Sequence, residues 1–315
     1  MNEKIGIGLD LGGTSIKYAL GTLNGKIIKQ AHLKIDSRAA KAKIIDKMHQ
    51  CIIKMLKYAD QNDLNVSAIG IGTPGNVNVK TGYLMGSTPN FTHWRDINIT
   101  REINKKIAIP VFVDNDANVM ALGEARYGAG KQYKNIVCVT VGTGIGSGFI
   151  IDGELYRGAF YAGAEFGHSL VVADGHKCNC GSDGCLEVYA SATAMINNYL
   201  NLCREQNKKP AGDKINAAYL FNLYHQGDRI ARQAIDRASY YLGRGLASAI
   251  NIFNPEIVII GGGVAEAGEI FIGKVRETAL RYAMTKPKEN VKVVMARLGN
   301  NAGFLGAISY AFENL

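Results

Sequence analysis

The feature that most restricts the fold is a strand pattern that occurs twice in the chain. Residues 4–28, KIGIGLDLGGTSIKYALGTLNGKII, read as an apolar strand, a glycine-rich turn, a second strand, a tight Asn-Gly turn and a third strand. Residues 135–156, NIVCVTVGTGIGSGFIIDGELY, repeat this order, and Asp152-Gly153 forms the second tight turn. Two similar halves of this kind predict an α/β fold with a ligand cleft between the halves.

Alternating helix and strand patterns follow each of these strand units. After the first unit we expect a helix over residues 37–59, strands at 67–72 and 109–114, and a helix directly after the second of these strands. After the second unit we expect helices from 187 to 251, the strand EIVIIG, a helix over 266–282 and the strand VKVVMA. This alternation is typical of α/β layers.

Length and composition are those of an ordinary globular protein. With 315 residues, 47% of them hydrophobic, the chain can form one large domain or two ordinary ones. The N-terminus lacks the basic start and long apolar run of a signal peptide, and the apolar runs elsewhere are too short to cross a bilayer. We therefore expect a soluble cytoplasmic protein with no membrane partner.

The net charge of +9 comes from 36 Lys and Arg residues against 27 Asp and Glu residues. An excess of this size is compatible with nucleic acid, a membrane surface or an anionic small substrate as partner. The lysines are dispersed through amphipathic stretches rather than massed in one block, which is typical of a generic basic surface. We therefore predict no nucleic-acid partner.

The glycine-rich turns predict phosphate binding. GTGIGSG is not a dinucleotide-binding fingerprint, because strand-type residues follow it where a helix would have to begin, and no P-loop motif occurs in the chain. Four glycines in seven positions exceed the one or two that a hairpin needs, and they allow backbone amides to close around phosphate oxygens. A third glycine run follows a strand and opens a helix, where a nucleotide can bind. The phosphate- and nucleotide-binding candidates are Gly12, Gly13, Thr14, Gly142, Thr143, Gly144, Gly261, Gly262 and Gly263.

Three of the six cysteines, Cys178, Cys180 and Cys185, lie within eight positions of the segment HKCNCGSDGCLE. In a reducing compartment such a cluster indicates a metal site rather than disulfides. Three thiolates need one more ligand to complete a tetrahedral zinc site, and His176 is the histidine nearest in the chain. The other three cysteines lie singly in apolar patterns and are interpreted as ordinary buried residues: Cys51, Cys138 and Cys203.

The segment VFVDNDANVMALGEA places four polar residues among five positions, between a buried strand that ends at Val113 and a following helix. A helix N-cap needs only one Asp or Asn, so this density indicates chemistry in addition to capping. A carboxylate at such a position can act as a general base. By contrast, Thr73-Pro74-Gly75 fits a plain turn, and Trp94 fits the core or a dimer contact.

Six segments, in their order along the chain, resemble the ROK family of bacterial repressors and sugar kinases. They are Asp10-Leu-Gly-Gly-Thr14, VDNDAN, GTGIGSG, AEFGH, CNCGSDGCLE and IGGGV. The Glu-x-Gly-His segment followed by the cysteine motif is highly specific, and the resemblance covers nearly the whole chain. It implies the fold of the actin-like ATPase and hexokinase superfamily: two ribonuclease-H-like domains with a cleft for sugar and ATP between them. The expected small domain is 1–115 plus 300–315, and the larger domain, 116–299, carries the zinc loop.

The resemblance also implies roles for individual residues. Asp116 matches the catalytic aspartate that deprotonates the sugar, Asp10 matches the carboxylate that holds Mg²⁺ through water, and Lys17 is expected to reach the phosphates. Asp114 is interpreted as a structural cap. His168 is implied as the fourth zinc ligand, so that the zinc site is closed and structural. The residues implied to bind the sugar are Gly75, Asn90, Asn115, Asp116, Glu165, His168 and Glu187.

The zinc loop is expected to control sugar recognition rather than ATP binding. Glu165 and Glu187 flank the first and last zinc ligands, so the metal would aim both carboxylates. The phosphate hairpins at Gly12 and Gly142 lie elsewhere in the chain and are expected to keep their shape without the metal.

The activity implied is ATP-dependent phosphorylation of a hexose at its 6-hydroxyl. Glucose is the first choice, because TPNFTHW resembles the corresponding glucokinase segment. N-acetylmannosamine, N-acetylglucosamine, fructose and allose kinases share every polar residue named above. A sugar-responsive transcriptional regulator is the non-enzyme alternative, but its N-terminal helix-turn-helix has no room before Lys4. A sugar-binding sensor without turnover would require a degraded Asp116 or Gly142-Thr143-Gly144, and neither is degraded. The expected assembly is a homodimer.

Overall fold

The computed structural model describes residues 4–86, 91–212 and 214–315. Within it the chain forms two compact units. Unit 1 comprises Met1–Gln132, Gly148–Ala164 and Arg297–Leu315, and unit 2 comprises Tyr133–Ser147 and Glu165–Ala296. The domain boundaries expected from the sequence, 1–115 plus 300–315 and 116–299, remain a prediction.

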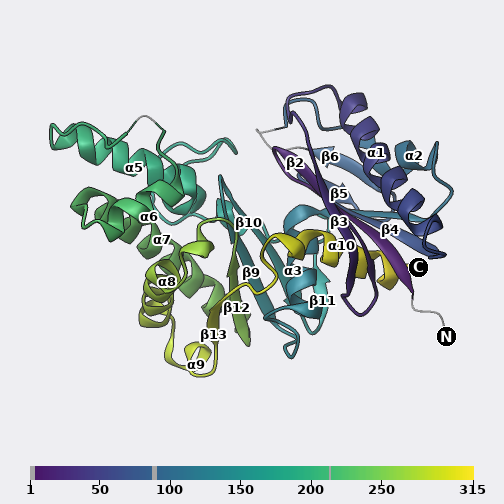
Figure 1. Ribbon diagram of the computed structural model, residues 1–315. Helices are drawn as coiled ribbons and strands as arrows, with labels where there is room; N and C mark the ends of the chain where they lie inside the picture. The colour runs from purple at the N-terminus through teal and green to yellow at the C-terminus, as the bar shows by residue number, and fades with distance from the viewer. Residues whose placement is uncertain (1–3, 87–90, 213) are drawn as a thin grey trace. The chain divides into compact units, whose positions relative to one another are not determined.

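Five strands form the central sheet of unit 1: β1 (Ile5–Leu11), β2 (Ser15–Thr22), β3 (Ile27–Lys34), β4 (Val66–Thr73) and β8 (Val111–Asn115). Their order is β3-β2-β1-β4-β8, and Figure 1 labels β2, β3 and β4 of this sheet. β1, β2 and β3 are antiparallel, as the first strand unit predicts, whereas β4 runs parallel to β1 and to β8. The pairing of β1 with β2 sets Asp10 opposite Lys17.

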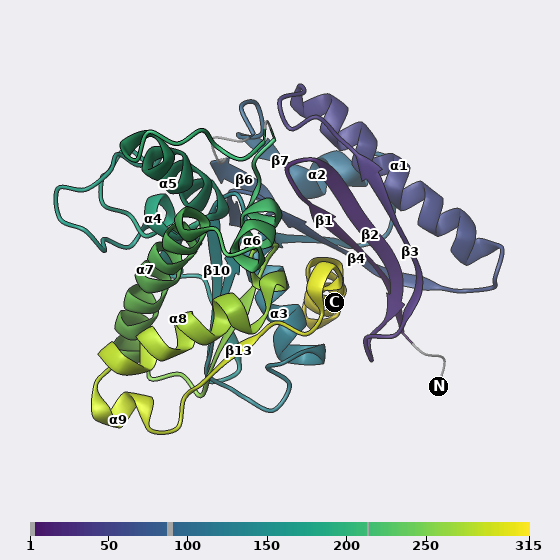
Figure 2. The same cartoon turned by 60° about the vertical axis from the view of Figure 1, so that its left-hand side comes forward.

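The two faces of this sheet differ because β1 and β4 alternate large and small residues. Both strands contain the run Ile-Gly-Ile-Gly, and successive side chains of a strand point to opposite faces. The isoleucines pack with α1 (Lys41–Asp60) into one apolar core, in which Met48 and Ile52 are fully buried. The glycines leave the other face open to α10 (Ala302–Glu313), which Figure 2 shows across the sheet from α1.

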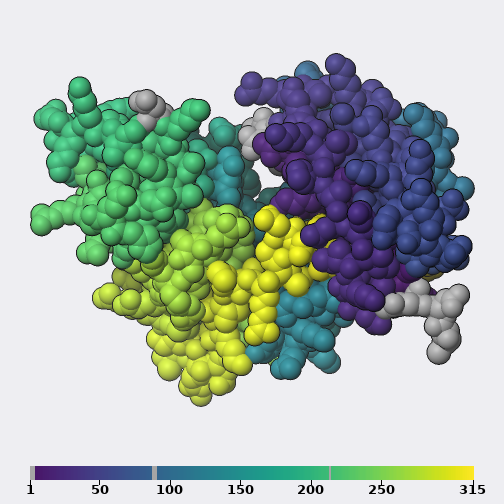
Figure 3. All heavy atoms as spheres, viewed as in Figure 1, coloured from purple at the N-terminus to yellow at the C-terminus, as the bar shows by residue number. Residues whose placement is uncertain are grey.

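α10 lies against the glycine face with its backbone in direct contact. A Cβ atom on Gly70 would lie 1.8 Å from the carbonyl oxygen of Ala307. α10 also packs on α3 (Asp116–Tyr127), where a Cβ atom on Gly306 would lie 1.6 Å from the carbonyl oxygen of Val119. In Figure 3 the yellow atoms of the C-terminal residues lie against the purple atoms of the N-terminal strands. No element was predicted for residues 302–313, so α10 is known only from the structure.

The second sheet repeats the topology of the first. Its strands are β9 (Ile136–Val141), β10 (Ile145–Ile151), β11 (Glu154–Tyr156), β12 (Ile257–Gly261) and β13 (Lys292–Met295). Their order is β11-β10-β9-β12-β13, and β12 runs parallel to both β9 and β13. Asp152 and Gly153 have φ angles of 54° and 87°, as the predicted tight turn requires. The repeated strand order confirms the predicted α/β fold and its two similar strand units.

Helices fill most of unit 2 between residues 187 and 253, close to the predicted range. The predicted helix over 266–282 begins later, at Glu269, because Gly268 has a φ angle of 64° and ends a preceding turn. Among the described residues, no helix has the length and apolar character needed to cross a membrane. The helices of unit 2 are α4 (Glu187–Ala190), α5 (Ala192–Glu205), α6 (Ala217–His225), α7 (Arg229–Phe253), α8 (Glu269–Tyr282) and α9 (Thr285–Lys288).

A small three-stranded sheet in unit 1 was not predicted. It consists of β5 (Asn76–Asn78), β6 (Tyr83–Gly86) and β7 (Ile97–Asn98), and α2 (Ile99–Asn104) follows it. These strands are too short to show a period in the sequence. Trp94 belongs to the core, as expected: it is fully buried, and its Nε1 donates a hydrogen bond to Thr73 Oγ1 at 2.7 Å. The three isolated cysteines are buried as well.

Gly70→Ala tests the contact between α10 and the sheet. The new methyl group cannot fit against Ala307 unless α10 moves, so the free energy of unfolding is expected to fall by about 1–3 kcal/mol. Urea denaturation measures the change. Gly273→Ala in α8 is the control, because a Cβ atom there meets only Glu269 Oε2, at 3.2 Å, and alanine favours a helix by up to about 1 kcal/mol. A Gly70→Ala protein as stable as the wild type would contradict the close packing.

Candidate active site

The ends of β4 and β8 bring together Gly75, Asn115 and Asp116. Asn115 is the N-cap of α3, and its Oδ1 accepts hydrogen bonds from the amides of Ala117 at 2.9 Å and Asn118 at 3.2 Å. Asn115 Nδ2 donates to the carbonyl oxygen of Gly75 at 3.2 Å. Asp116 is the first residue of α3, and its Oδ1 accepts from the Ala117 amide at 2.9 Å. One asparagine side chain thus connects the start of α3 to the turn after β4.

The turn at Gly75 requires glycine. Its φ angle is 97°, and a Cβ atom there would lie 2.0 Å from the carbonyl oxygen of Gly86. The sequence motif Thr73-Pro74-Gly75 is therefore a tight turn packed on β6. Asn90, another predicted sugar contact, lies outside the described residues.

Asp10, at the end of β1, occupies a space that a glycine of α10 leaves for it. A Cβ atom on Gly303 would lie 2.5 Å from Cγ of Asp10. Burial raises the pKa of Asp10 from 3.8 to about 6, while the positive charge of Lys17 opposes the shift. Lys17 Nζ donates to Oδ1 of Asn300 at 2.5 Å. A cation bound at this carboxylate would favour its ionised form.

The first glycine turn follows Asp10 directly. The Gly12 amide donates to the carbonyl oxygen of Ser15 at 2.9 Å, which closes the turn. Gly13 and Thr14 are exposed, and a Cβ atom on Gly13 would meet nothing within 4 Å. The tip of this turn is accessible to a ligand.

The interpretation of Asp114 as the helix cap is wrong, because Asn115 occupies the N-cap position. Asp114 is buried, and its carboxylate accepts hydrogen bonds from Asn118 Nδ2 at 3.0 Å and from Arg157 Nε at 2.8 Å. Arg157 is not among the residues predicted from the sequence. A single arginine after a short strand gives no signal of a partner 43 residues away.

In unit 2 the structure brings His168, Cys178, Cys180 and Cys185 together. One ligand atom from each residue lies within 4.8 Å of all the others. His168 Nδ1 is 3.6 Å from Cys178 Sγ, and Cys180 Sγ is 3.6 Å from Cys185 Sγ. Zinc bond lengths of about 2.0–2.3 Å give a tetrahedron with edges of roughly 3.5–3.8 Å, so these donors fit such an ion. His176 instead stacks on Tyr189, with ring centroids 5.0 Å apart.

The protonation of the thiols is consistent with a metal site that releases protons on binding. Burial raises the pKa of Cys178, and it raises the pKa of Cys185 to about 12. The Ser182 amide lowers the pKa of Cys180 by hydrogen bonding. A metal ion binds thiolates, so it would have to displace at least the two protons on the buried thiols.

Glu187 links this cysteine loop to the second glycine hairpin. Its Oε2 accepts from the Ile145 amide at 2.9 Å, and a Cβ atom on Gly144 would lie 2.3 Å from the same oxygen. Thr193 Oγ1, from the helix that follows, donates to the carbonyl oxygen of Thr143 at 2.8 Å. The expectation that the Gly142 hairpin is independent of the loop therefore needs correction, because the two are hydrogen-bonded within unit 2.

The third glycine run lies beside the same hairpin. Gly262 has a φ angle of 85°, and a Cβ atom there would lie 2.4 Å from the carbonyl oxygen of Val141. Val264 donates its amide to that oxygen at 3.1 Å. The predicted phosphate-binding residues Gly142–Gly144 and Gly261–Gly263 thus lie on adjacent turns of unit 2.

Glu165 precedes a short 3-10 helix, η1 (Phe166–His168), which presents His168 to the cysteines. Its side chain is exposed, yet partial desolvation and the negative charge of Glu187 raise its pKa, against the effect of His168. Glu165, His168 and Glu187 therefore form one electrostatic group around the cysteine loop.

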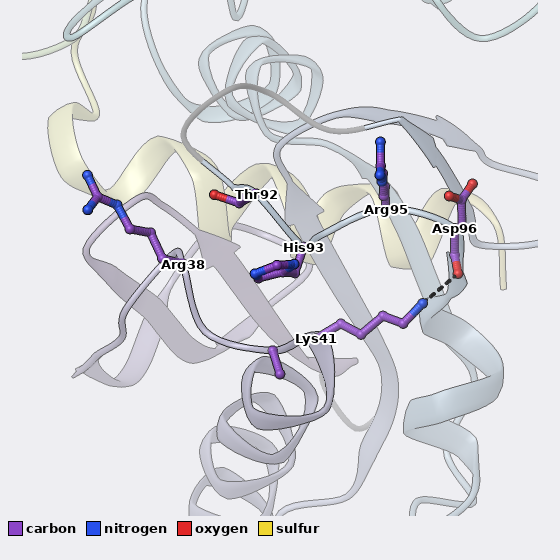
Figure 4. Close-up of a pocket in the computed structure, with 7 residues that line it drawn as sticks. Arg38, Lys41, Thr92, His93, Arg95 and Asp96 are labelled. Atoms are coloured by element: carbon purple, nitrogen blue, oxygen red, sulfur yellow. Dashed lines mark hydrogen bonds between the residues drawn. The ribbon is translucent and has the colours of Figure 1, made fainter.

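A hollow of about 450 Å³ in unit 1 is lined by residues that include none of the predicted site residues that the structure describes. Figure 4 shows Lys41 extended to the carbonyl oxygen of Asp96, at 3.1 Å, while Arg38 points away on the other side. The cationic groups do not converge on one point. The hollow is lined by Arg38, Ala40, Lys41, Thr92, His93, Arg95 and Asp96.

Comparison with known proteins finds relatives that match nearly the whole chain. The sequence model of the ROK family matches residues 6–314. A glucokinase from Thermotoga maritima is 40% identical over 315 residues, which cover 98% of each chain. The xylose repressor of Bacillus subtilis is 32% identical, over 99% of this chain and 79% of the repressor.

Solved structures show the same fold. A ROK family glucokinase from Streptomyces griseus, in complex with glucose and AMPPNP, matches with a TM-score of 0.84 and 31% identity, over 98% of this chain and 99% of that one. A ROK hexokinase from Thermus thermophilus matches with a TM-score of 0.83 and 30% identity, over 98% of each chain. These matches confirm the predicted actin-like ATPase fold. The chain belongs to the ROK family.

Proposed function

We propose that this protein is a sugar kinase that transfers the γ-phosphoryl group of ATP to the 6-hydroxyl of a hexose, with glucose as the preferred substrate. The observation that carries the proposal is the arrangement of Gly75, Asn115 and Asp116 around the start of α3. The 40% identity to a glucokinase, and the likeness to a glucokinase that binds glucose and AMPPNP, support the same substrates here.

Asp116 is the proposed base. Its carboxylate would take the proton of the attacking hydroxyl as the phosphoryl group passes through a loose, highly charged transition state. Asn115 uses its Oδ1 for the helix cap and one Nδ2 hydrogen for Gly75. Among the described residues, the second Nδ2 hydrogen has no recorded acceptor, so it can donate to a sugar hydroxyl, and the cap fixes the direction in which it points.

The phosphates of ATP are proposed to bind the backbone amides of the glycine turns, Gly12–Thr14 and Gly142–Gly144, with Gly261–Gly263 beside the nucleotide. Mg²⁺, when bound, would neutralise phosphate charge, and Asp10 is the residue that would hold it through water. Lys17 lies opposite Asp10 in the sheet and would add a positive charge toward the phosphates.

Zinc is the metal proposed for His168 and the three cysteines. Four protein ligands close the coordination sphere, so the ion would organise the loop and would not activate water. Since His168 turns Nδ1 toward the sulfur atoms, its Nε2 is the atom available to a sugar hydroxyl. Glu165 and Glu187 are the other proposed sugar contacts of this unit.

A transcriptional regulator is the second candidate, because a xylose repressor is similar over 99% of this chain. The dispersed positive charge and the residues around Asp116 favour the kinase.

We further propose a cytoplasmic homodimer without a nucleic-acid or membrane partner. The alternative sugars are N-acetylmannosamine, N-acetylglucosamine, fructose and allose.

An ADP-release assay with these sugars and glucose tests both the reaction and its substrate. We expect the highest kcat/KM with glucose.

Asp116→Asn is expected to lower kcat by roughly a hundredfold or more, because the base is lost, while the affinity for glucose changes little. Asp46→Asn, which removes an exposed carboxylate of α1, is the control. Near wild-type turnover by Asp116→Asn would exclude Asp116 as the base, and a saturable, salt-resistant footprint on one DNA site would favour the regulator.

Metal analysis is expected to find about one zinc per chain, as one four-ligand site requires. Cys180→Ala leaves three ligands, so the protein should lose zinc and show a rise in the KM for sugar of about tenfold or more. Because Glu187 bonds the Ile145 amide, the affinity for nucleotide should weaken too, although by a smaller factor. His176→Ala is the control and should keep its zinc. Native protein without zinc, or Cys180→Ala with normal sugar kinetics, would contradict the proposal.

Asp10 makes the stability of the metal-free protein depend on pH. Its folded pKa, about 6, is raised above 3.8, so the folded state holds this proton more tightly than the unfolded state. The contribution of Asp10 to the free energy of unfolding is complete below about pH 4 and is lost as the pH rises through 6. Asp10→Asn should therefore raise the Tm at pH 8 without Mg²⁺. The free energy of unfolding is expected to rise by up to about 3 kcal/mol.

Added Mg²⁺ should stabilise the wild-type protein at pH 8 and should have little effect on Asp10→Asn, which is expected to be inactive. Thermal unfolding with and without Mg²⁺ at pH 5 and pH 8 measures both effects. A lower Tm for Asp10→Asn than for the wild type at pH 8 would show that the buried carboxylate does not destabilise the fold.

A further inference from the structure

The sequence motif around the proposed base contains one residue that the proposed reaction does not use directly. Asp114 lies in β8, two residues before Asp116, and is 1% exposed. A buried carboxylate next to a catalytic residue needs a partner, because an unpaired charge in the interior is strongly unfavourable. That partner is Arg157, the residue after β11.

Both oxygens of Asp114 are fully engaged. Oδ2 accepts from Arg157 Nε at 2.8 Å and Nη2 at 2.7 Å. Oδ1 accepts from the Asn115 amide at 2.7 Å and from Asn118 Nδ2 at 3.0 Å. Asp114 therefore has no oxygen left for a substrate, and it acts only on the protein around it.

The guanidinium group of Arg157 is held by other elements of unit 1. Its Nη1 donates to the carbonyl oxygen of Leu155 at 3.4 Å, and its central carbon lies 5.2 Å from the centre of the Tyr310 ring in α10. The backbone of Arg157 accepts a hydrogen bond from the Gly163 amide at 2.9 Å. The side chain is 21% exposed, against 2% for that of Asp114, so the ion pair is largely shielded from water.

The bonds made by Asp114 enclose the start of α3. One goes to the amide of Asn115, the N-cap, and the other goes to the side chain of Asn118, one turn into the helix. Asp116 lies between them in the chain. Arg157 therefore fixes the position of Asp114, and Asp114 in turn fixes residues 115–118, which include the proposed base and the proposed sugar-binding amide.

We propose that Arg157 is a positioning residue of this kinase: through Asp114 it fixes the backbone of residues 114–118, so that Asn115 and Asp116 face the sugar hydroxyls. The proposal rests on the proposed function of Asp116. An alternative is that Arg157 only neutralises the buried charge of Asp114. The positioning role and the neutralising role predict different kinetics for a substitution of Arg157 that keeps the positive charge but changes the hydrogen-bond geometry.

Arg157→Lys separates them. Lysine keeps the positive charge, but it lacks the planar fork that places two N–H groups on one carboxylate oxygen. We expect kcat with glucose to fall by about tenfold to a hundredfold, because small errors in the placement of a base are costly. The KM for glucose should rise as Asn115 shifts, and the KM for ATP should stay unchanged. Simple neutralisation predicts wild-type kinetics.

The double variant Asp114→Asn with Arg157→Met removes both charges together, so no unpaired charge is buried. Its Tm, measured beside that of Arg157→Lys, shows whether the fold is kept. We expect a folded protein with a kcat as low as that of Arg157→Lys. Added guanidinium ion should partly restore kcat in Arg157→Ala, since it can occupy the vacated position beside Asp114.

The control is the pair Arg126 and Glu313, which also joins an arginine to a carboxylate at 2.8 Å but is exposed. Arg126→Met with Glu313→Gln should leave the kinetics unchanged. Wild-type kcat in both Arg157→Lys and the double variant would overturn the positioning role, while an inactive Asp116→Asn would leave the proposed function intact. An active Asp116→Asn would exclude Asp116 as the base, and a wild-type protein that phosphorylates none of the sugars would overturn the proposed function itself.

Discussion

The site in unit 1 depends on the backbone contact between α10 and the glycine face of the sheet. A Cβ atom on Gly8 would lie 2.0 Å from the carbonyl oxygen of Phe304, so no side chain can come between β1 and this helix. The same helix places Gly303 against Asp10, and it brings Tyr310 over the guanidinium group of Arg157. Contacts of this kind have no flexible side chain that can absorb a change, which makes the helix a rigid support for several polar groups at once.

Unit 2 holds its polar residues by a different means. The loop from Glu165 to Glu187 has little regular structure and many exposed residues, so burial of apolar side chains contributes little to its order. Four ligand atoms lie within 4.8 Å of one another, so a metal ion bound there would order the loop. The proposed sugar contacts of unit 1 rest on packed backbone, whereas those of unit 2 would rest on the proposed metal ion.

Much of the fold could be predicted because its signals are local. The strand units show period-two alternation and glycine turns, and the two five-stranded sheets have equivalent strand orders, as expected of two similar units. α10 was missed because Gly303 and Gly306 are poor helix residues on propensity alone, whereas the structure needs them for close approach. The short strands of the small sheet carry too few residues to show a period.

The site was predictable to a similar degree. The sequence shows polar residues at the end of a buried strand, and in the structure Asn115 ends β8 and Asp116 begins α3. Which of the polar residues caps α3 depends on backbone angles that the sequence does not show. The Arg157–Asp114 pair and the Glu187–Ile145 bond join residues 43 and 42 positions apart in the chain. Neither type of residue indicates such a partner by itself, so these contacts required the folded structure.

The hydrogen bond from the Ile145 amide to Glu187 also has a thermodynamic consequence. It makes one carboxylate part of both the cysteine loop and the glycine hairpin, so the two proposed binding events in unit 2 share a structural element. Binding free energies that are coupled in this way are reciprocal. Whatever factor a bound metal adds to the affinity for nucleotide, a bound nucleotide must add to the affinity for the metal. A high ATP concentration in the cell would thereby favour retention of a metal ion at the proposed zinc site.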